Sequence, residues 1–492
     1  MKSILLLSVL FAQFAALSAA DTVPENAVPP EPALHAMPPL AQWKLLFSGA
    51  GDVTNTWGAL HFGVTPVRRI REYEPPDFTI IGCFPHPGGA WEVFGQRMTE
   101  ISRGDKPYDR VTTWKLLRAT TRDGVMLEGA ESVFEPKPAA WTDHCAMAYN
   151  SDAREYLLLK LKVDRSGFAY TAFFSSDGRR WQEHPGNPLF YDGDAMSLFW
   201  SPVLRRFVCV NKSLQPHRKH ILDHGGPTPA LGDDSLRDRR VLMTRSSPDG
   251  RRWEPSVSLS DVWNRNGRKG AVPAEFLTVP DADDPPDLEF YSGNGFWYHD
   301  RAYMMVLNYA ASPLSPRKHG PQLDNEWWVS RDGLRWERPA RGVNALDMFP
   351  QIPRLETHPM IVNGTILFAR GNLLLGLPED RISYISARAN GEFSTRPLPV
   401  PETDLFLNAA SPAPDRPFAK DQAYVMVAAL DENGSIIPGF EREKCVIRNE
   451  DRRDIPLKWG DATARQLAGR TIRLRFFFRS ANIYAVTSRP SP

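Results

Sequence analysis

The apolar residues of this chain recur in short runs that predict β-strands. Residues 155–163, 168–174, 302–309 and 365–370 are rich in aliphatic and aromatic side chains, and β-branched and aromatic residues favour strands. Residues 471–478 alternate polar and apolar side chains, which is typical of a strand buried on one face. No long segment has the period of an amphipathic helix. The pattern therefore predicts an all-β fold.

A short motif, Ser-x-Asp-Gly-x-x-Trp, follows several of these strand-like runs. It occupies residues 175–181, 247–253 and 330–336. Asp-Gly supplies residues that tolerate a positive φ in a hairpin turn, and the Ser and Asp side chains can bond the backbone amides of that turn. Each copy thus marks a turn between two strands, with its Trp placed to pack between neighbouring sheets. A weaker copy begins at Thr121 and a degenerate copy spans residues 386–393, so the repeat predicts five small sheets.

Five small sheets in succession predict a five-bladed β-propeller, which we place at residues 41–399. The copies lie farther apart than the about 40–50 residues that a four-stranded blade needs. The excess falls in polar segments such as residues 212–240 and 261–286, which we expect to be long loops that line a site. Residues 79–83 and 91–94 are predicted to close the ring by joining the sheet of the last blade.

Both ends of the chain differ from its middle. Residues 1–20 contain Lys2, an apolar run and a Ser-Ala-Ala end, which predicts a cleaved signal peptide and a secreted or periplasmic protein. An uncleaved membrane anchor is the alternative, but the run is shorter than the roughly twenty residues of a spanning helix, and no later run approaches that length. Residues 21–40 are rich in Pro and Ala and are predicted to be a linker, and residues 400–492 are predicted to form a small β-sandwich.

Charge and motif content argue against several functional classes. The chain has 59 Lys and Arg against 58 Asp and Glu, a net charge of +1, which does not indicate a nucleic acid or a charged membrane surface as partner. There is no Gly-rich phosphate loop, serine nucleophile elbow or His-Glu-x-x-His motif, so no cofactor is expected. The acidic segment 281–287 leaves a calcium site as an alternative.

Cysteines do not point to a metal site either. The four cysteines lie far apart and form no Cys-x-x-Cys pair, so a zinc site is not expected. Disulfides, which export would permit, and buried free thiols both stay open. These residues are Cys83, Cys145, Cys209 and Cys445.

The repeats and the C-terminal segment together resemble a known group of proteins. The Ser-x-Asp-Gly-x-x-Trp copies are similar to those of secreted five-bladed propellers related to glycoside hydrolase families 32 and 43, the invertase-like and arabinanase-like enzymes. The likeness covers residues 110–488. The repeat is also similar to the Asp-box of sialidases, which has one more residue between Asp and Gly. The segments that resemble the sandwich at the end of such proteins are residues 437–440, 459–460, 467–469, 473–476 and 481–484.

The resemblance implies three acids on three blades, at the innermost strands that line the central funnel. Glycoside hydrolysis needs a protonated carboxylic acid on the leaving oxygen and an ionised carboxylate on the opposite face of the sugar ring. Neighbouring carboxylates shift each other's pKa, so that one can stay protonated near neutral pH. The resemblance therefore implies hydrolysis of an extracellular poly- or oligosaccharide. On the first strand, where the group has an acid, this sequence offers only Asp52 as a weak counterpart.

Acidic residues occur where four of the innermost strands are predicted to begin. Asp143 is the candidate base or nucleophile, and Asp194 is the candidate orienting acid. The proton donor is predicted to be Glu356 or one of the pair Asp287 and Glu289. The simpler interpretation of each is a loop carboxylate that caps backbone amides.

Neighbouring polar and aromatic residues are candidate sugar-binding groups. His144, Glu289 and His358 offer hydrogen bonds to sugar hydroxyls, and Trp200 and Tyr298 offer rings for stacking. Packing within or between blades is the simpler interpretation of the same residues. A non-catalytic carbohydrate-binding or scaffold propeller and a sialidase-like enzyme stay open as alternatives, as does a lyase or phosphorylase on the same fold.

Overall fold

The structure is a computed structural model that describes residues 44–72, 76–86, 88–216, 238–256, 276–285, 288–310, 322–346, 358–371, 373–412 and 423–489. The predicted signal peptide and linker lie outside the described residues. Regular structure within the described residues is β-strand, apart from short 3₁₀ helices at Ala50–Asp52 (η2), Pro107–Asp109 (η3), Arg442–Lys444 (η6) and Ala464–Leu467 (η7). None of the helices described is long and apolar enough to cross a bilayer.

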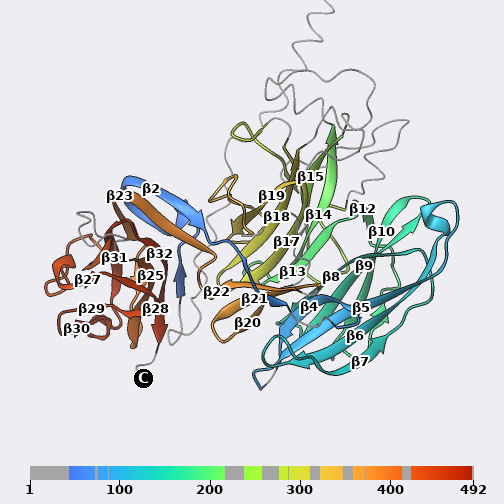
Figure 1. Ribbon diagram of the computed structural model, residues 1–492, viewed down its shortest axis with the longest axis horizontal. Coiled ribbons are helices and arrows are strands. Elements are labelled where there is room, and N and C mark those ends of the chain that lie inside the picture. Colours follow the sequence, from blue (N-terminus) through green and yellow to red (C-terminus); the bar gives the residue numbers. More distant parts are fainter. Residues whose placement is uncertain are drawn as a thin grey trace, which may run out of the picture. The chain divides into compact units, whose positions relative to one another are not determined.

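Five antiparallel sheets form the blades of a β-propeller, which confirms the predicted fold (Figure 1). The first blade contains β4 (Thr79–Pro85), β5 (Trp91–Ser102), β6 (Val111–Thr121) and β7 (Glu128–Phe134). The second contains β8 (Trp141–Asn150), β9 (Glu155–Asp164), β10 (Gly167–Ser175), β11 (Gln182–Glu183) and β12 (Phe190–Asp192). The third contains β13 (Met196–Ser201), β14 (Arg206–Pro216), β15 (Asp238–Ser247) and β16 (Leu277–Thr278). The fourth contains β17 (Leu288–Tyr298), β18 (Arg301–Ala310) and β19 (Gln322–Ser330), and the fifth contains β20 (Met360–Val362), β21 (Thr365–Arg370), β22 (Leu373–Pro378) and β3 (Arg68–Glu72).

The first strand of each blade is its innermost strand. Contacts join β4 to β8, β8 to β13, β13 to β17, and β20 to β4. Each blade then runs outward as a meander, so these first strands lie around the channel and their N-terminal ends meet at the same mouth. This arrangement brings residues that are far apart in the sequence to one end of the channel.

The ring is closed by a strand that the sequence pattern did not reveal. β3 pairs with β22 and completes the fifth blade, whereas residues 79–83 and 91–94, predicted to play this part, belong to β4 and β5 of the first blade. The prediction of the closing strands was wrong because β3 is the sequence Arg-Arg-Ile-Arg-Glu and every one of its residues is exposed. An outer edge strand of this kind has no buried face to produce an apolar pattern.

The repeated motif forms the turn that its chemistry predicts. In the second blade the Ser175 Oγ accepts a hydrogen bond from the Gly178 amide at 2.9 Å. The Asp177 carboxylate accepts from the amides of Arg179 and Arg180 at 2.8 and 2.7 Å, and these bonds lower the pKa of Asp177. The Trp181 ring lies 6.1 Å from the ring of Phe94 in the first blade. The motif therefore closes a turn and also ties one blade to its neighbour.

The degenerate copy at residues 386–393 does not mark a blade. It lies inside β23 (Ser383–Thr395), which pairs with β2 (Val53–Val64) and β31 (Thr471–Arg479) outside the propeller. This fifth assignment was wrong because Asn390-Gly391 occurs within a strand that bulges against β2, and an Asn-Gly pair alone does not separate a bulge from a turn.

The glycine of the motif gives a stability prediction. Gly250 has φ of +74°, and a Cβ there would lie 2.7 Å from Leu157 Cδ2. Gly434 has a similar φ of +84° with no atom within 4 Å of a Cβ, so Gly434→Ala isolates the backbone term of roughly 1 kcal/mol. Overpacking adds about 1–3 kcal/mol, so we expect Gly250→Ala to lose about 2–4 kcal/mol of unfolding free energy in denaturant titrations. Equal losses for the two variants would contradict this.

The remaining strands form one ten-stranded sheet built from both ends of the described chain. Hydrogen bonds join them into a single sheet, so a two-layer sandwich stays a prediction. β1, β2, β23 and β24, which fall within the segment predicted as propeller, pair in this sheet. The 400–492 boundary stays a prediction as well. Its strands are β1 (Lys44–Leu46), β2, β23, β24 (Leu398–Pro399), β25 (Asp404–Ser411), β26 (Tyr424–Leu430), β27 (Val446–Ile447), β28 (Glu450–Pro456), β31 and β32 (Asn482–Arg489). The strands β29 (Lys458–Trp459) and β30 (Ala462–Thr463), which follow β28 in the sequence, pair with each other.

Apolar clusters pack against the strands of this sheet and fill the spaces between the blades. In the ten-stranded sheet, the Phe393 ring stacks on Phe476 at 4.8 Å and meets Phe47 at 5.2 Å. All four cysteines lie in the described part of the chain as free thiols. Burial raises the pKa of Cys83 and Cys209 to about 12, so these two thiols behave as apolar core residues.

Candidate functional site

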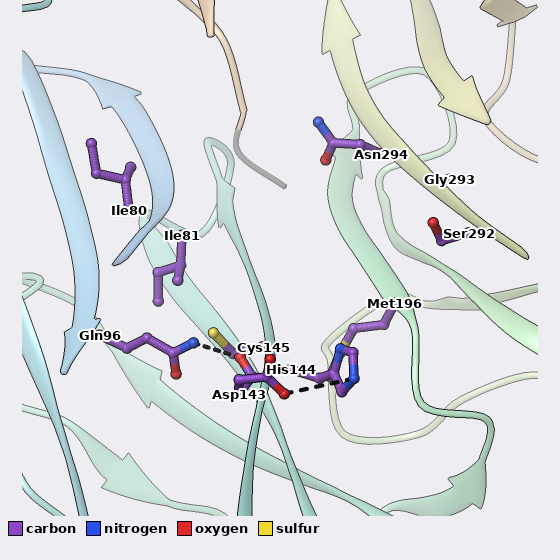
Figure 2. Close-up of a pocket in the computed structure, with 10 residues that line it drawn as sticks. All are labelled: Ile80, Ile81, Gln96, Asp143, His144, Cys145, Met196, Ser292, Gly293 and Asn294. Atoms are coloured by element: carbon purple, nitrogen blue, oxygen red, sulfur yellow. Dashed lines mark hydrogen bonds and ion pairs between the residues drawn. The ribbon is translucent and has the colours of Figure 1, made fainter. Parts of the chain in front are cut away.

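A small cavity of about 30 Å³ lies near the N-terminal ends of β4, β8 and β13 and beside the middle of β17 (Figure 2). Residues of four blades reach it, because these strands lie around the same channel. β8 contributes the three consecutive residues Asp143, His144 and Cys145, and β13 contributes Met196. The other lining residues are Ile80, Ile81, Gln96, Ser292, Gly293 and Asn294.

Asp143 and His144 lie where β8 departs from regular pairing with β9. Trp141 pairs with Lys162 and Cys145 with Lys160, so the residues between them are bulged out of the ladder. A bulge re-aims side chains that would otherwise alternate between faces. The Asp143 carboxylate lies 3.7 Å from His144 Nε2, and a dashed line joins these two side chains in Figure 2. The Asp143 side chain is 80% exposed, so a ligand at the mouth can reach it.

A buried relay holds the backbone of this bulge. The Gln96 amide donates to the backbone carbonyl of Asp143, and the Lys160 ammonium donates to the Gln96 amide oxygen. Lys160 is fully buried beside the Trp114 ring, 5.3 Å from its centre, and burial lowers its pKa. The relay satisfies a carbonyl that the bulge has released from the ladder, and it couples the first blade to the position of Asp143.

Asp194, in the turn between β12 of the second blade and β13 of the third, interacts electrostatically with the same histidine. Burial works to raise the pKa of Asp194, but the paired Lys212 ammonium, aided by His144, holds this pKa below its ordinary value. Asp194 is therefore an ionised carboxylate at neutral pH. His144 thus interacts electrostatically with two carboxylates, one exposed and one held ionised by a lysine.

The turn that carries Asp194 is fixed by buried groups. Arg245 on β15 pairs with Asp192 at 2.6 Å, and both side chains are 0% exposed. The Tyr170 hydroxyl donates to the Gly193 carbonyl at 2.8 Å. These contacts join the second blade to the third directly before Asp194, so the carboxylate is placed by the blade interface rather than by a free loop.

The predicted proton donors are placed differently. Asp287 and Glu356 lie outside the described residues. Glu289 is buried on β17, where its carboxylate pairs with the Arg240 guanidinium and accepts from the Arg240 amide at 3.1 Å. Among the acids that the structure describes, Asp143 and Asp194 are thus the two that the sequence predicted and that interact electrostatically with His144. Their catalytic roles stay predictions.

Three of the predicted binding residues lie away from Asp143: Trp200 and Tyr298 near the ends of β13 and β17, and His358 directly before β20. Trp200, Tyr298 and His358 line a separate cavity that shares no residue with the one beside Asp143. The Trp200 ring packs on Phe207 at 5.0 Å, and the Tyr298 hydroxyl donates to Asp380. The structure therefore separates these three residues from His144, and Glu289 lines neither of the two cavities.

Arginine side chains bind the other acidic candidates that the structure describes. Asp52 is buried and accepts from the amides of Ser48 and Gly49 and from Arg301 and Arg331. In the segment where calcium was an alternative, both carboxylate oxygens of Asp281 bind Arg341 at 2.7 Å, and Asp284 binds Arg338 at 2.5 Å. Within the described ranges, His, Cys, Asp and Glu side chains form no cluster suited to a metal.

His358 gives a pH prediction. Its Nε2 lies 2.8 Å from the Leu198 carbonyl and therefore carries the proton of a neutral ring, and burial lowers its pKa from 6.5 to about 4. The unfolded chain gains a proton between those pH values that the folded chain does not, so stability falls as pH drops from about 6.5 to 4, by up to about 3 kcal/mol.

His358→Gln, which can keep the bond to Leu198, removes this term. We expect the unfolding free energy of His358→Gln to fall less between pH 7 and pH 4 than that of the wild type. The variant His61→Gln, at an exposed position, is the control and should follow the wild type. Parallel pH curves for all three proteins would show that His358 is not buried in its neutral form.

Comparisons with known proteins give distant structural neighbours. No family model matches the chain, and no curated protein matches it. A glycosyl hydrolase from Bacteroides ovatus is 13% identical over 63% of this chain and 86% of its own, with a TM-score of 0.37. A protein of the GH130 family of mannoside phosphorylases, which contains glycoside hydrolases that target β-1,2-mannosidic linkages in Candida mannan, is 14% identical over 68% of this chain and 96% of its own, with a TM-score of 0.37.

A β-fructofuranosidase from Schwanniomyces occidentalis is 8% identical over 86% of this chain and 98% of its own, with a TM-score of 0.35. These neighbours are glycoside hydrolases. TM-scores below 0.5 do not establish a common fold, so the function of this chain has to follow from its own residues.

Proposed function

We propose that this chain is a glycoside hydrolase-like enzyme whose site is the Asp143–His144–Asp194 cluster. The observation that carries the proposal is the exposed Asp143 carboxylate 3.7 Å from His144 Nε2 beside a cavity, with the ionised Asp194 acting electrostatically with the same histidine. Neither carboxylate stabilises the blades by burial beside an arginine, as Asp192 and Glu289 do. Glycoside hydrolysis requires an ionised carboxylate on one face of the sugar ring and a separate protonated acid on the leaving oxygen, and this cluster would supply the ionised side.

The environments of the two acids suit different roles. Asp143 is exposed at the mouth and is the proposed base or nucleophile. Asp194 is held ionised by Lys212 and is the proposed orienting group, which keeps His144 and Asp143 in place and favours positive charge on the sugar ring. Because the Glu289 carboxylate is bound by Arg240, the proposed proton donor is Asp287 or Glu356.

The proposed substrate is an extracellular poly- or oligosaccharide, and the proposed location is secreted or periplasmic. Both rest on residues 1–20, whose charged start, apolar run and Ser-Ala-Ala end are typical of an export signal. Mass spectrometry of the protein recovered from the periplasm or medium of an expressing bacterium is expected to show a chain that begins at Asp21. A chain that keeps residues 1–20 would contradict cleaved export.

A screen for reducing-sugar release tests the activity. Purified residues 21–492 are incubated with plant, algal and animal glycans, with and without inorganic phosphate. Hydrolysis predicts release without phosphate. Phosphorolysis creates no new reducing end, because the released sugar leaves as a glycosyl phosphate, so phosphate-dependent formation of a sugar phosphate would identify that reaction instead. Binding to one glycan without release would favour the alternative, a carbohydrate-binding propeller. Release that persists in both Asp143→Asn and Asp194→Asn would place the chemistry elsewhere in the chain.

A further inference from the structure

A second, larger cavity lies at the opposite end of the innermost strands. Its volume is about 430 Å³, within the range of about 300–1,000 Å³ typical of small-molecule sites. It is lined by Phe84 at the end of β4, Tyr149 at the end of β8, Trp200 near the end of β13 and Trp297 near the end of β17. The cavity beside Asp143 is lined instead by residues near the beginnings of β4, β8 and β13 and by the middle of β17.

Aromatic rings supply much of the wall of this cavity. Trp297 and Tyr149 are only partly buried, so both rings keep surface at the cavity. The Trp297 N–H is bound to the His299 carbonyl at 2.8 Å, and the Tyr149 ring packs on Tyr156 at 4.6 Å. Both rings are thus held in place before any ligand arrives, which reduces the entropy cost of binding.

The cavity carries little unbalanced charge. Burial lowers the pKa of both His299 and His358, so these rings are neutral at pH 7. Lys44 and Glu379 are the charged residues in the described lining, and they form an ion pair at 3.0 Å. A charged ligand would be desolvated here without a counter-charge, which is costly. The cavity therefore suits a neutral ligand.

Polar groups lie among the rings. Within the described residues the Tyr149 hydroxyl makes no hydrogen bond, and Ser151 beside it is exposed. A purely apolar ligand would bury the Tyr149 hydroxyl without a partner. A ligand with an apolar face and hydroxyls at its edge would cover the rings and satisfy the hydroxyl.

We propose that this cavity is a second, non-catalytic site that binds a neutral sugar ring. A pyranose has a C–H face that can cover Trp297 or Tyr149 and hydroxyls that can reach Tyr149 and Ser151. The site is separate from the Asp143 cluster, so it would hold a sugar whether or not the cluster hydrolyses glycans.

Calorimetric titration of the purified protein with neutral sugars tests this proposal. The probes are the methyl glycosides of glucose, mannose, galactose and xylose, with cellobiose and mannobiose, and all titrations use the Asp143→Asn background so that nothing is cleaved. Ser151→Trp fills the cavity from an exposed turn, and Trp297→Leu removes one ring while leaving an apolar side chain. Ser166→Trp, at another exposed turn outside the cavity, is the matched control.

We expect at least one probe to bind saturably, and its affinity to fall at least tenfold in both Ser151→Trp and Trp297→Leu. Ser166→Trp should keep the affinity, and all variants should keep the circular dichroism of the parent protein. Absence of binding by every probe overturns the proposal. So does binding that survives Ser151→Trp, which would place the sugar at the Asp143 mouth and leave the proposed hydrolase site intact.

Discussion

Replacing Asp143 by Asn is expected to lower the rate of glycan cleavage by about a hundred- to ten-thousandfold, the range that one acid–base group contributes. The Asn side chain keeps the shape but cannot act as a base or a nucleophile. The relay through Gln96 binds the backbone carbonyl of residue 143 and not its side chain, so it should survive the change. Because the Asp143 side chain is 80% exposed, the unfolding free energy should change by no more than about 0.5 kcal/mol.

Asp152→Asn is the matched control for this variant. Asp152 follows the other end of the same strand, and its exposed pair with Arg205 at 2.8 Å is worth little stability. Initial rates of reducing-sugar release are measured for wild type, Asp143→Asn and Asp152→Asn on the best glycan of the screen. A rate for Asp143→Asn within a few-fold of the control would remove Asp143 from the chemistry.

Local turn chemistry made the propeller predictable. The Ser-x-Asp-Gly-x-x-Trp copies reveal the blades because each turn is satisfied within its own loop, as the bonds of Asp177 to the next amides show. Ring closure is not local. It depends on β3, an exposed and charged strand that pairs with a partner at the other end of the propeller sequence. No pattern of buried residues reports such a pairing.

The site was predictable in part for the same reason. Asp143 and Asp194 directly precede or begin innermost strands, so the start of each apolar run points to them. Gln96, Lys160 and Lys212 lie on the outer strands β5, β9 and β14, and their approach depends on register between strands. The one local signal was Lys160, a lysine within an apolar run.

The length of β13 and β17 explains why Trp200 and Tyr298 lie apart from His144. A strand advances about 3.3 Å per residue, so Tyr298, at the end of β17, lies about 13–20 Å along the strand from Asn294 and Ser292, which line the cavity beside Asp143. Trp200 similarly falls near the end of β13. The sequence places these residues on the right strands, but nearness in sequence to an acid does not say which mouth of the channel a side chain reaches.

Removal of the Asp192 carboxylate is expected to cause the largest loss of stability. Asp192 and Arg245 are both 0% exposed and lie 2.6 Å apart across the second and third blades. Asp192→Ala leaves the buried guanidinium without this carboxylate, and breaking a buried pair in this way costs about 3–5 kcal/mol. Denaturant titrations of wild type and Asp192→Ala measure the loss.

The double variant Asp192→Leu with Arg245→Met separates the effect of the unpaired charge on stability from the effect of packing. Replacing both charges by apolar side chains is often neutral, so we expect the double variant to recover most of the stability that Asp192→Ala loses. Equal instability of the single and double variants would mean that packing, not the unpaired charge, dominates. Glycan cleavage should fall in the double variant even if stability returns, because the turn that carries Asp194 is then no longer held by Arg245. A stable double variant with full activity would show that Asp194 does not need this anchor.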